Sequence, residues 1–282
     1  MSLIERTLGK VRKSGVGRDM PVTARRAPLQ PPVSRVVADP QLRVTREMRQ
    51  QLGLELPDEH VHQRASEYRQ IKRQVVAEIR SNPDDRVVIV TSALAGEGKS
   101  FTSANLARSL AMEPDYTVLL VDGDAVKPAL SRALQITHRP GLMNALGDAS
   151  CDVNSLILTT DIEGLSVLPA GSSSENATEY FGSERMRLIL AALQSVPNRI
   201  VLIDSLPLLL TTEARVLMPL ASQVLLVVRA ESTPQAAVQQ ALNLIGETGN
   251  VKLVLNASVR TRLSRYFGYD YGFDYDYSTQ GK

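Results

Sequence analysis

Five short apolar runs, separated by segments with helical spacing, constrain the fold of this chain most. Strands that are apolar on both faces and alternate with helices indicate a parallel sheet with helices on both sides. We therefore predict an α/β fold with a doubly wound, mainly parallel sheet, and flexible N- and C-terminal segments. The predicted strands are residues 86–92, 116–124, 199–205, 223–230 and 251–257. The predicted helices are residues 100–112 and segments near 127–135, 183–195, 212–221 and 234–246.

The junction between the first strand and the first helix has the pattern of a phosphate-binding loop. It reads AGEGKS, and Ala93 replaces the first glycine of the Walker A pattern. Glycines let backbone N–H groups approach phosphate oxygens, and the helix N-terminus adds partial positive charge. Lys99 is expected to reach the β- and γ-phosphates, and Ser100 to bind Mg²⁺. The nucleotide contacts predicted for this P-loop NTPase fold are Ala95, Gly96, Glu97, Gly98, Lys99, Ser100 and Phe101.

Acidic residues lie at the carboxyl ends of two predicted strands, where ligands bind in such sheets. Asp204 ends RIVLID, and Asp122 and Asp124 lie in VLLVDGDAVKP. For a carboxylate pair at a strand end alone, we would favour a structural role as a polar cap. Beside a P-loop, such a pair can hold a metal and accept a proton from an attacking hydroxyl. Asp204 suits a Walker B role at Mg²⁺, and the Asp122 and Asp124 pair can hold the metal or accept the proton. Either member of the Asp122 and Asp124 pair remains possible as the base.

Charge is distributed unevenly along the chain. Residues 1–50 carry a net charge of +7, and the remainder carries −5. This leader is Pro-rich and contains no Phe, Tyr or Trp to stack on bases, so we predict a solvated linker and no nucleic-acid partner. No stretch approaches the roughly 18 apolar residues of a membrane-spanning helix, and the single Cys151 has no internal disulfide partner. We predict a cytoplasmic protein.

Several further motifs together resemble the bacterial tyrosine autokinases, the P-loop kinases of exopolysaccharide loci, and most closely their exosortase-associated type. These are TSALAGEGKSFTSANLA, VLLVDGDAVKP, PGLMNAL, LPAG, SERM, IDSLPLLLTTEARVL and TPQAAVQQAL. The resemblance covers roughly residues 61–282. It implies ATP- and Mg²⁺-dependent phosphorylation of the protein's own tyrosines, which regulates exopolysaccharide chain length, polymerisation or export. The implied organisation is a leader and linker at 1–60, a kinase domain at 61–260 and a Tyr-rich tail at 261–282.

The tail supplies candidate acceptors independently, because Gly and Asp interleave its tyrosines and leave no apolar periodicity for packing. The predicted phosphoacceptors, five of the eight tyrosines, are Tyr266, Tyr269, Tyr271, Tyr275 and Tyr277. The resemblance also implies these partners: a transmembrane chain-length protein that holds the enzyme at the inner face of the membrane, further copies of the chain, and a cognate tyrosine phosphatase.

The resemblance also implies a role for each site residue. It implies Ser100, Asp124 and Asp204 as Mg²⁺ ligands. The implied catalytic residues are Lys99, Asp122 and Asp124, and Asp122 is favoured as the base for the tyrosine hydroxyl.

Two positions depart from the family pattern. Many members carry Arg two places after the second Asp, where this chain has Val126 followed by Lys127. The family's self-association motif, Glu-x-x-Arg-x-x-Arg, maps onto Ser66, Arg69 and Lys72, so only its first Arg is kept. The sequence therefore supports assembly into a ring less strongly than it supports catalysis.

The alternative function is that of a partitioning or cell-division positioning ATPase of the same superfamily. Those proteins resemble one another in a signature Lys five residues before the P-loop Lys, where this chain has Leu94. They also lack a tyrosine-rich tail. A catalytically silent scaffold is disfavoured because the full set of site residues is present, and no H-R-D or D-F-G stretch of a eukaryotic-type kinase occurs.

Overall fold

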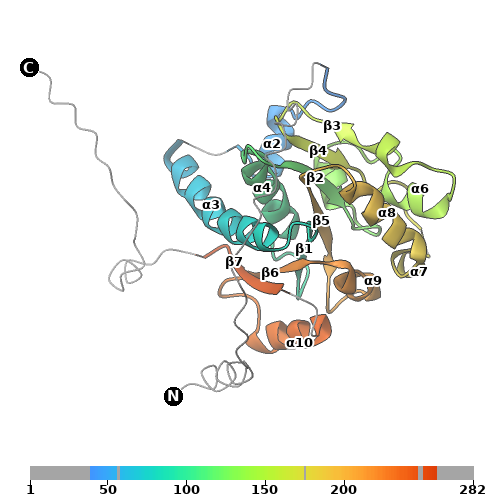
Figure 1. The fold of residues 1–282 in the computed structure, drawn as a ribbon. Helices are drawn as coiled ribbons and strands as arrows, with labels where there is room; N and C mark the ends of the chain where they lie inside the picture. Colours follow the sequence, from blue (N-terminus) through green and yellow to red (C-terminus); the bar gives the residue numbers. More distant parts are fainter. Residues whose placement is uncertain (1–38, 56–57, 175, 247–249, 259–282) are drawn as a thin grey trace, which may run out of the picture. The chain divides into compact units, whose positions relative to one another are not determined.

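The computed structural model describes residues 39–55, 58–174, 176–246 and 250–258. Within these residues, seven strands form one sheet in the order β3-β4-β2-β5-β1-β6-β7 (Figure 1). Neighbouring strands run parallel, except that β3 is antiparallel to β4. The predicted doubly wound, mainly parallel sheet is confirmed. The strands are β1 (Val87–Ser92), β2 (Thr117–Asp122), β3 (Leu158–Thr159), β4 (Leu165–Leu168), β5 (Arg199–Pro207), β6 (Gln223–Arg229) and β7 (Asn250–Asn256).

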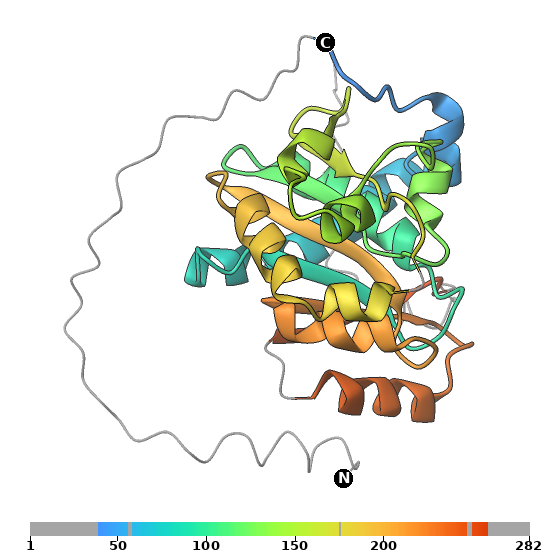
Figure 2. The same ribbon diagram turned by 90° about the vertical axis from the view of Figure 1, so that its right-hand side faces the viewer.

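Helices cover both faces of the sheet (Figures 1 and 2). One core contains apolar side chains from α2 (Arg46–Gln51), α3 (Asp58–Ser81), α4 (Lys99–Ala111) and α5 (Ala129–Ala133). The opposite core contains those of α6 (Leu142–Gly147), α7 (Ala177–Phe181), α8 (Glu184–Gln194), α9 (Thr212–Leu217) and α10 (Gln235–Ile245). Two short 3-10 helices, η1 (Val153–Leu156) and η2 (Met218–Leu220), complete the described helices.

The central strands explain why the sequence predicted a sheet buried on both faces. All six residues of β1 are buried, and alternate ones belong to opposite cores: Val88 and Val90 to one, Val87 and Ile89 to the other. Strand β5 lies between β1 and β2. The carboxyl ends of β1, β2 and β5 therefore meet at one edge, which is the usual ligand-binding edge of such sheets.

The structure contains packed elements that the sequence pattern did not predict. The 24-residue helix α3 packs on α4, and the short strands β3 and β4 extend the sheet beyond β2. The predicted kinase domain begins at residue 61, yet residues 39–55 already pack on this fold, because Leu42, Val44 and Met48 are buried in the α3–α4 core. No helix among the described residues combines the length and apolar character needed to cross a bilayer.

Candidate active site

The phosphate-binding loop connects the end of β1 to the start of α4, as predicted. Gly98 caps α4 with φ of +94°, and Gly96 has φ of +78°, so both occupy the left-handed region that favours glycine. A Cβ added at Gly98 would lie 2.0 Å from the side-chain nitrogen of Asn256, whereas one at Gly96 would meet nothing within 4 Å. The backbone is therefore open beside Gly96 and closely packed at Gly98.

Side chains at the carboxyl ends of β6 and β7, and Thr233 after β6, hold the conformation of this loop. The Glu97 carboxylate is buried and accepts hydrogen bonds from the Leu94 N–H, at 2.7 Å, and from the Thr233 hydroxyl. The Glu97 carbonyl accepts a bond from Asn256 at 2.9 Å, and the Gly96 carbonyl accepts one from Arg229 at 3.2 Å. The sequence analysis did not find Arg229, Thr233 and Asn256, because they lie over 130 residues away from the loop and form no motif with it.

The two predicted acidic positions come together on neighbouring strands: Asp122 ends β2, and Asp204 lies near the carboxyl end of β5. Asp122 of β2 is directly in register with Asp204 of β5, and both are buried. The Ser103 hydroxyl of α4 donates to Asp204 at 3.0 Å. The Asp122 carboxylate accepts the N–H groups of Ser131, at 2.7 Å, and of Asp124, at 3.2 Å. Ser103 and Ser131 are supporting residues that the sequence patterns did not single out.

Burial gives both carboxylates unusual acid–base properties. Desolvation raises the pKa of Asp122 to about 6, and the hydrogen bonds from Ser131 oppose that shift. Desolvation and the neighbouring charge of Asp122 raise the pKa of Asp204 to about 7, while Ser100, Lys99 and Ser103 lower it. The structure thus brings Lys99, Ser100 and Asp122 close to Asp204. Their roles in binding nucleotide and metal stay a prediction.

Asp124 has a different environment from Asp122. It is only half-buried, and one of its carboxylate oxygens accepts the N–H groups of Val126, at 3.1 Å, and Lys127, at 2.7 Å. Asp124 therefore caps the turn that follows β2. Lys127 directly follows Val126, which occupies the position of the family's Arg, and Lys127 is exposed.

A cleft of about 790 Å³ lies beside the loop. Its walls come from α3, the first turn of α4 and the carboxyl end of β7, and they include Tyr68, Gly98, Phe101 and Asn256. This volume suits a nucleoside-sized ligand. The Phe101 ring lies against Arg64, whose guanidinium carbon is 4.8 Å from the ring centroid.

The donor set fits Mg²⁺ and a nucleotide together. No group of three or more His, Cys, Asp or Glu side chains in the described part of the chain could hold a metal unaided. Mg²⁺ commonly uses one or two carboxylates and completes its octahedron with water and substrate phosphates. The Asp204 carboxylate beside the Ser100 hydroxyl, with the carboxylates of Asp122 and Asp124 near it, offers such a partial site.

The predicted acceptors Tyr266, Tyr269, Tyr271, Tyr275 and Tyr277 lie outside the described residues. Of the other tyrosines, Tyr68 is buried, and desolvation raises the pKa of its hydroxyl to about 12.

Comparison with known proteins places this site in a family. The family described as AAA domain matches residues 85–260. CapB of Staphylococcus aureus, which is assigned as a tyrosine-protein kinase, is 31% identical over 69% of this chain and 85% of its own length. The chain belongs to the bacterial tyrosine-protein kinases. The kinase is also 28% identical to the tyrosine-protein kinase CpsD of Streptococcus agalactiae, over 68% of this chain and 84% of CpsD.

Other similar proteins include a much longer protein, a kinase domain and an enzyme with a different name. The succinoglycan biosynthesis transport protein ExoP of Rhizobium meliloti is 30% identical over 66% of this kinase, which spans only 24% of ExoP. The VpsO kinase domain superposes with a TM-score of 0.58 at 28% identity and covers 68% of this chain and 98% of that domain. A cobyrinic acid a,c-diamide synthase of Mycobacterium smegmatis, solved with an ATP analogue and magnesium, gives a TM-score of 0.50 at 25% identity, over 64% of this chain and 79% of its own. The exosortase-associated type stays a prediction.

Proposed function

We propose that this kinase transfers the γ-phosphate of ATP to the tyrosines of its own C-terminal segment, in trans, and thereby regulates the chain length, polymerisation or export of an exopolysaccharide. The observation that carries the proposal is the junction of the P-loop with Asp122 and Asp204, two buried carboxylates in register on adjacent strands. The names of CapB, CpsD and ExoP support the kinase and polysaccharide parts of the proposal.

In the proposed reaction, different residues of the site bind the phosphates and the metal ion. Backbone N–H groups of the loop and the ammonium group of Lys99 bind the phosphates. Ser100, Asp124 and Asp204 would hold Mg²⁺, which supplies positive charge to the triphosphate. The tyrosine oxygen attacks the γ-phosphorus, the bond from that phosphorus to the β–γ bridging oxygen breaks, and ADP leaves.

Asp122 is proposed to accept the proton that the tyrosine hydroxyl loses in this step. A pKa of about 6 leaves Asp122 mainly ionised at neutral pH and more basic than an ordinary aspartate. Asp124, which is half-buried at the same strand end, is the second candidate. If Asp122 is the base, Asp122→Asn removes the acidic limb of the pH profile of kcat measured at saturating MgATP, whereas Asp124→Asn retains it.

The proposed partners follow from the family. A transmembrane chain-length protein would recruit the kinase to the inner face of the membrane, and a cognate tyrosine phosphatase would reverse the modification. The basic leader would contribute to recruitment through anionic lipids, at about 1 kcal/mol for each Lys or Arg near the surface.

Phosphotyrosine mapping by mass spectrometry after incubation with ATP and Mg²⁺ tests the activity. Lys99→Met and Asp204→Asn should each slow labelling of residues 266–277 at least about a hundredfold, since each removes a charge from the phosphate site. Asp115→Asn is the matched control, because Asp115 is an exposed carboxylate outside the site. Labelling of Lys99→Met at the wild-type rate would refute the assigned site.

A further inference from the structure

Residues 41–55, here called the strap, connect the edge of the sheet to the helix that follows the phosphate-binding loop. At its beginning, Leu42 forms a parallel bridge with Thr160, and the Leu42 N–H donates to the Thr159 carbonyl at 3.0 Å. Leu42, Val44 and Met48 then enter the apolar core beside α4. The strap is therefore packed into the core that also contains α3 and α4.

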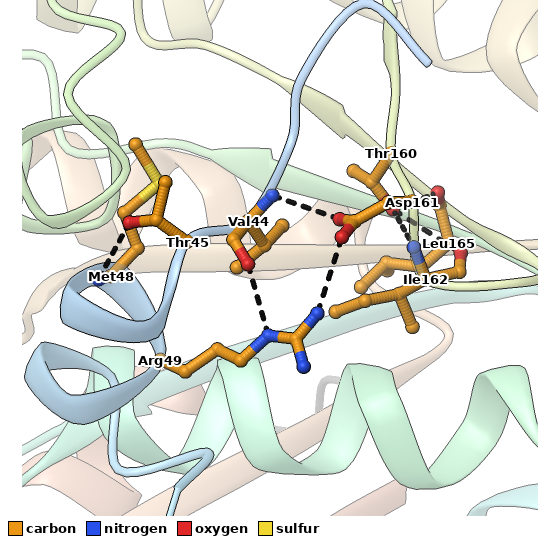
Figure 3. A network of polar contacts seen from close by, with 8 residues as sticks. All are labelled: Val44, Thr45, Met48, Arg49, Thr160, Asp161, Ile162 and Leu165. Carbon is orange, nitrogen blue, oxygen red and sulfur yellow. Dashed lines mark hydrogen bonds and ion pairs between the residues drawn. The ribbon is translucent and has the colours of Figure 1, made fainter. Parts of the chain in front are cut away.

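One carboxylate fastens the beginning of the strap (Figure 3). Asp161 accepts the Val44 N–H on one oxygen, at 2.8 Å, and the Arg49 guanidinium on the other, at 3.2 Å. Arg49 in turn donates to the Val44 carbonyl at 3.0 Å, which closes the network. Both of these bonds to the Asp161 carboxylate come from the strap.

The other end of the strap is bound by three side chains at three successive carbonyls. Asn105 donates to the Leu52 carbonyl at 3.0 Å, Arg64 to that of Gly53 at 3.1 Å, and Arg108 to that of Leu54 at 2.9 Å. Asn105 and Arg108 belong to α4, the helix that carries Lys99 and Ser100. Asn105 also donates to the Phe101 carbonyl at 2.8 Å, so one amide joins the strap to the first turn of α4.

Phe101 makes the closest approach between the strap and the nucleotide site. A Cβ added at Gly53 would lie 2.0 Å from the Phe101 ring, so the ring packs directly on the glycine backbone. Gly53 has φ of +64°, and the Arg64 guanidinium covers the Phe101 ring from α3. The residue two places after the P-loop Lys is thus enclosed by the strap and α3.

We infer that the strap is a built-in positioning element of the nucleotide site, and that Phe101 is the positioning residue through which it acts. The inference rests on the proposed function, since it concerns how the P-loop helix is held for MgATP. The strap braces α4 from one side, while Arg229, Thr233 and Asn256 hold the loop from the other. Releasing the strap should therefore loosen the first turn of α4 and weaken nucleotide binding.

The decisive variant is Asp161→Ala in the full chain, because it loosens the beginning of the strap without changing a residue of α4 or of the cleft. We expect the KM for MgATP to rise about three- to tenfold, with kcat within about twofold of wild type. A purely structural loss would reduce the amount of active enzyme and so lower the apparent kcat without changing KM. Asp161→Asn, which keeps one acceptor oxygen for the Val44 N–H, should recover part of the effect.

A double-mutant cycle with Phe101→Ala tests whether the strap acts through Phe101. If both changes break one connection, their combined effect on KM is smaller than the product of the single effects. Arg46→Gln is the matched control, because Arg46 pairs with Glu55 inside the strap and its side chain is 81% exposed. This control should keep wild-type kinetics.

Hydrogen exchange of the ligand-free protein provides a readout that does not depend on kinase activity. Amides 101–105 should exchange faster in Asp161→Ala and in the alternative variant Arg49→Ala, but not in Arg46→Gln. A wild-type protein that fails to phosphorylate would overturn the proposed function, and exchange would still decide the role of the strap. Unchanged exchange at residues 101–105, an unchanged KM, or fully multiplicative effects would overturn the inference.

Discussion

At the scale of residues, the candidate active site contains two buried carboxylates on adjacent strands. Asp122 and Asp204 are adjacent in register, and each is hydrogen-bonded by a serine that no motif identified. Burial, and secondly the neighbouring charge of Asp122, favour the protonated form of Asp204 and raise its pKa to about 7. A divalent cation and the ammonium group of Lys99 would favour the ionised forms instead.

This electrostatic balance predicts opposite pH effects on ligand-free stability and on metal binding. Because the folded-state pKa of Asp204 is raised above its usual 3.8, its contribution to stability is present at low pH and is lost as pH rises through about 7. The ligand-free protein should gain less stability from this site at pH 8 than at pH 6, and Mg²⁺–nucleotide affinity should fall as pH decreases between those values.

Thermal unfolding and nucleotide titration at both pH values check these effects in wild type and Asp204→Asn. The variant should be more stable than wild type at pH 8, should lose much of the pH dependence and should bind Mg²⁺–nucleotide weakly throughout. An Asp204→Asn protein with the full wild-type pH dependence would contradict the assignment.

At the scale of elements, the P-loop was predictable from sequence because all its parts are local. Strand β1, the glycines and the start of α4 follow one another within residues 87–111, and each acts through backbone geometry. Asp122 and Asp204 were predictable because each directly follows a run of apolar strand residues in the sequence. The pairing of β2 with β5, which brings them together, required the three-dimensional topology.

The strap was not predictable for a physical reason. Its helix α2 has only six residues, and its charged, Pro-flanked composition resembles that of a linker. Its stability comes from contacts with Asn105, Arg108 and Asp161, which lie 53 to 117 residues away. The short strands β3 and β4 escaped prediction similarly, because two and four residues carry too little periodicity.

The loop glycines allow a paired prediction at this scale. Gly96→Ala and Gly98→Ala both place a side chain at positive φ, which costs about 1 kcal/mol of stability or more. Only Gly98→Ala also collides with Asn256, which holds the Glu97 carbonyl. Calorimetry and nucleotide titration should show the larger loss of stability and of affinity for Gly98→Ala, and an equal or larger loss for Gly96→Ala would contradict the described loop packing.

At the scale of the whole molecule, the proposed trans reaction requires contact between copies. The tail from 266 to 282 carries three Asp and one Lys, so its side chains sum to −2 before modification. Each phosphate adds about −1.5 to −2 at neutral pH, which should repel the tail from a nucleotide site lined by carboxylates.

Assembly should therefore respond to phosphorylation. We expect Lys99→Met protein to be oligomeric and exhaustively phosphorylated wild type to be largely monomeric, as measured by native mass spectrometry at equal concentration and salt. Greater assembly of the phosphorylated protein would rule out release of the tail by charge.

A complementation experiment tests the central claim most directly. The acceptor is the Lys99→Met chain with its tail intact, and the donor is the active chain with Phe at the five tail tyrosines. After mixing with ATP and Mg²⁺, mass spectrometry should find phosphotyrosine within residues 266–277 of the acceptor, and none when the donor also carries Lys99→Met. An acceptor that stays unlabelled, while wild type alone labels its tail, would contradict phosphorylation of one copy's tail at another copy's nucleotide site.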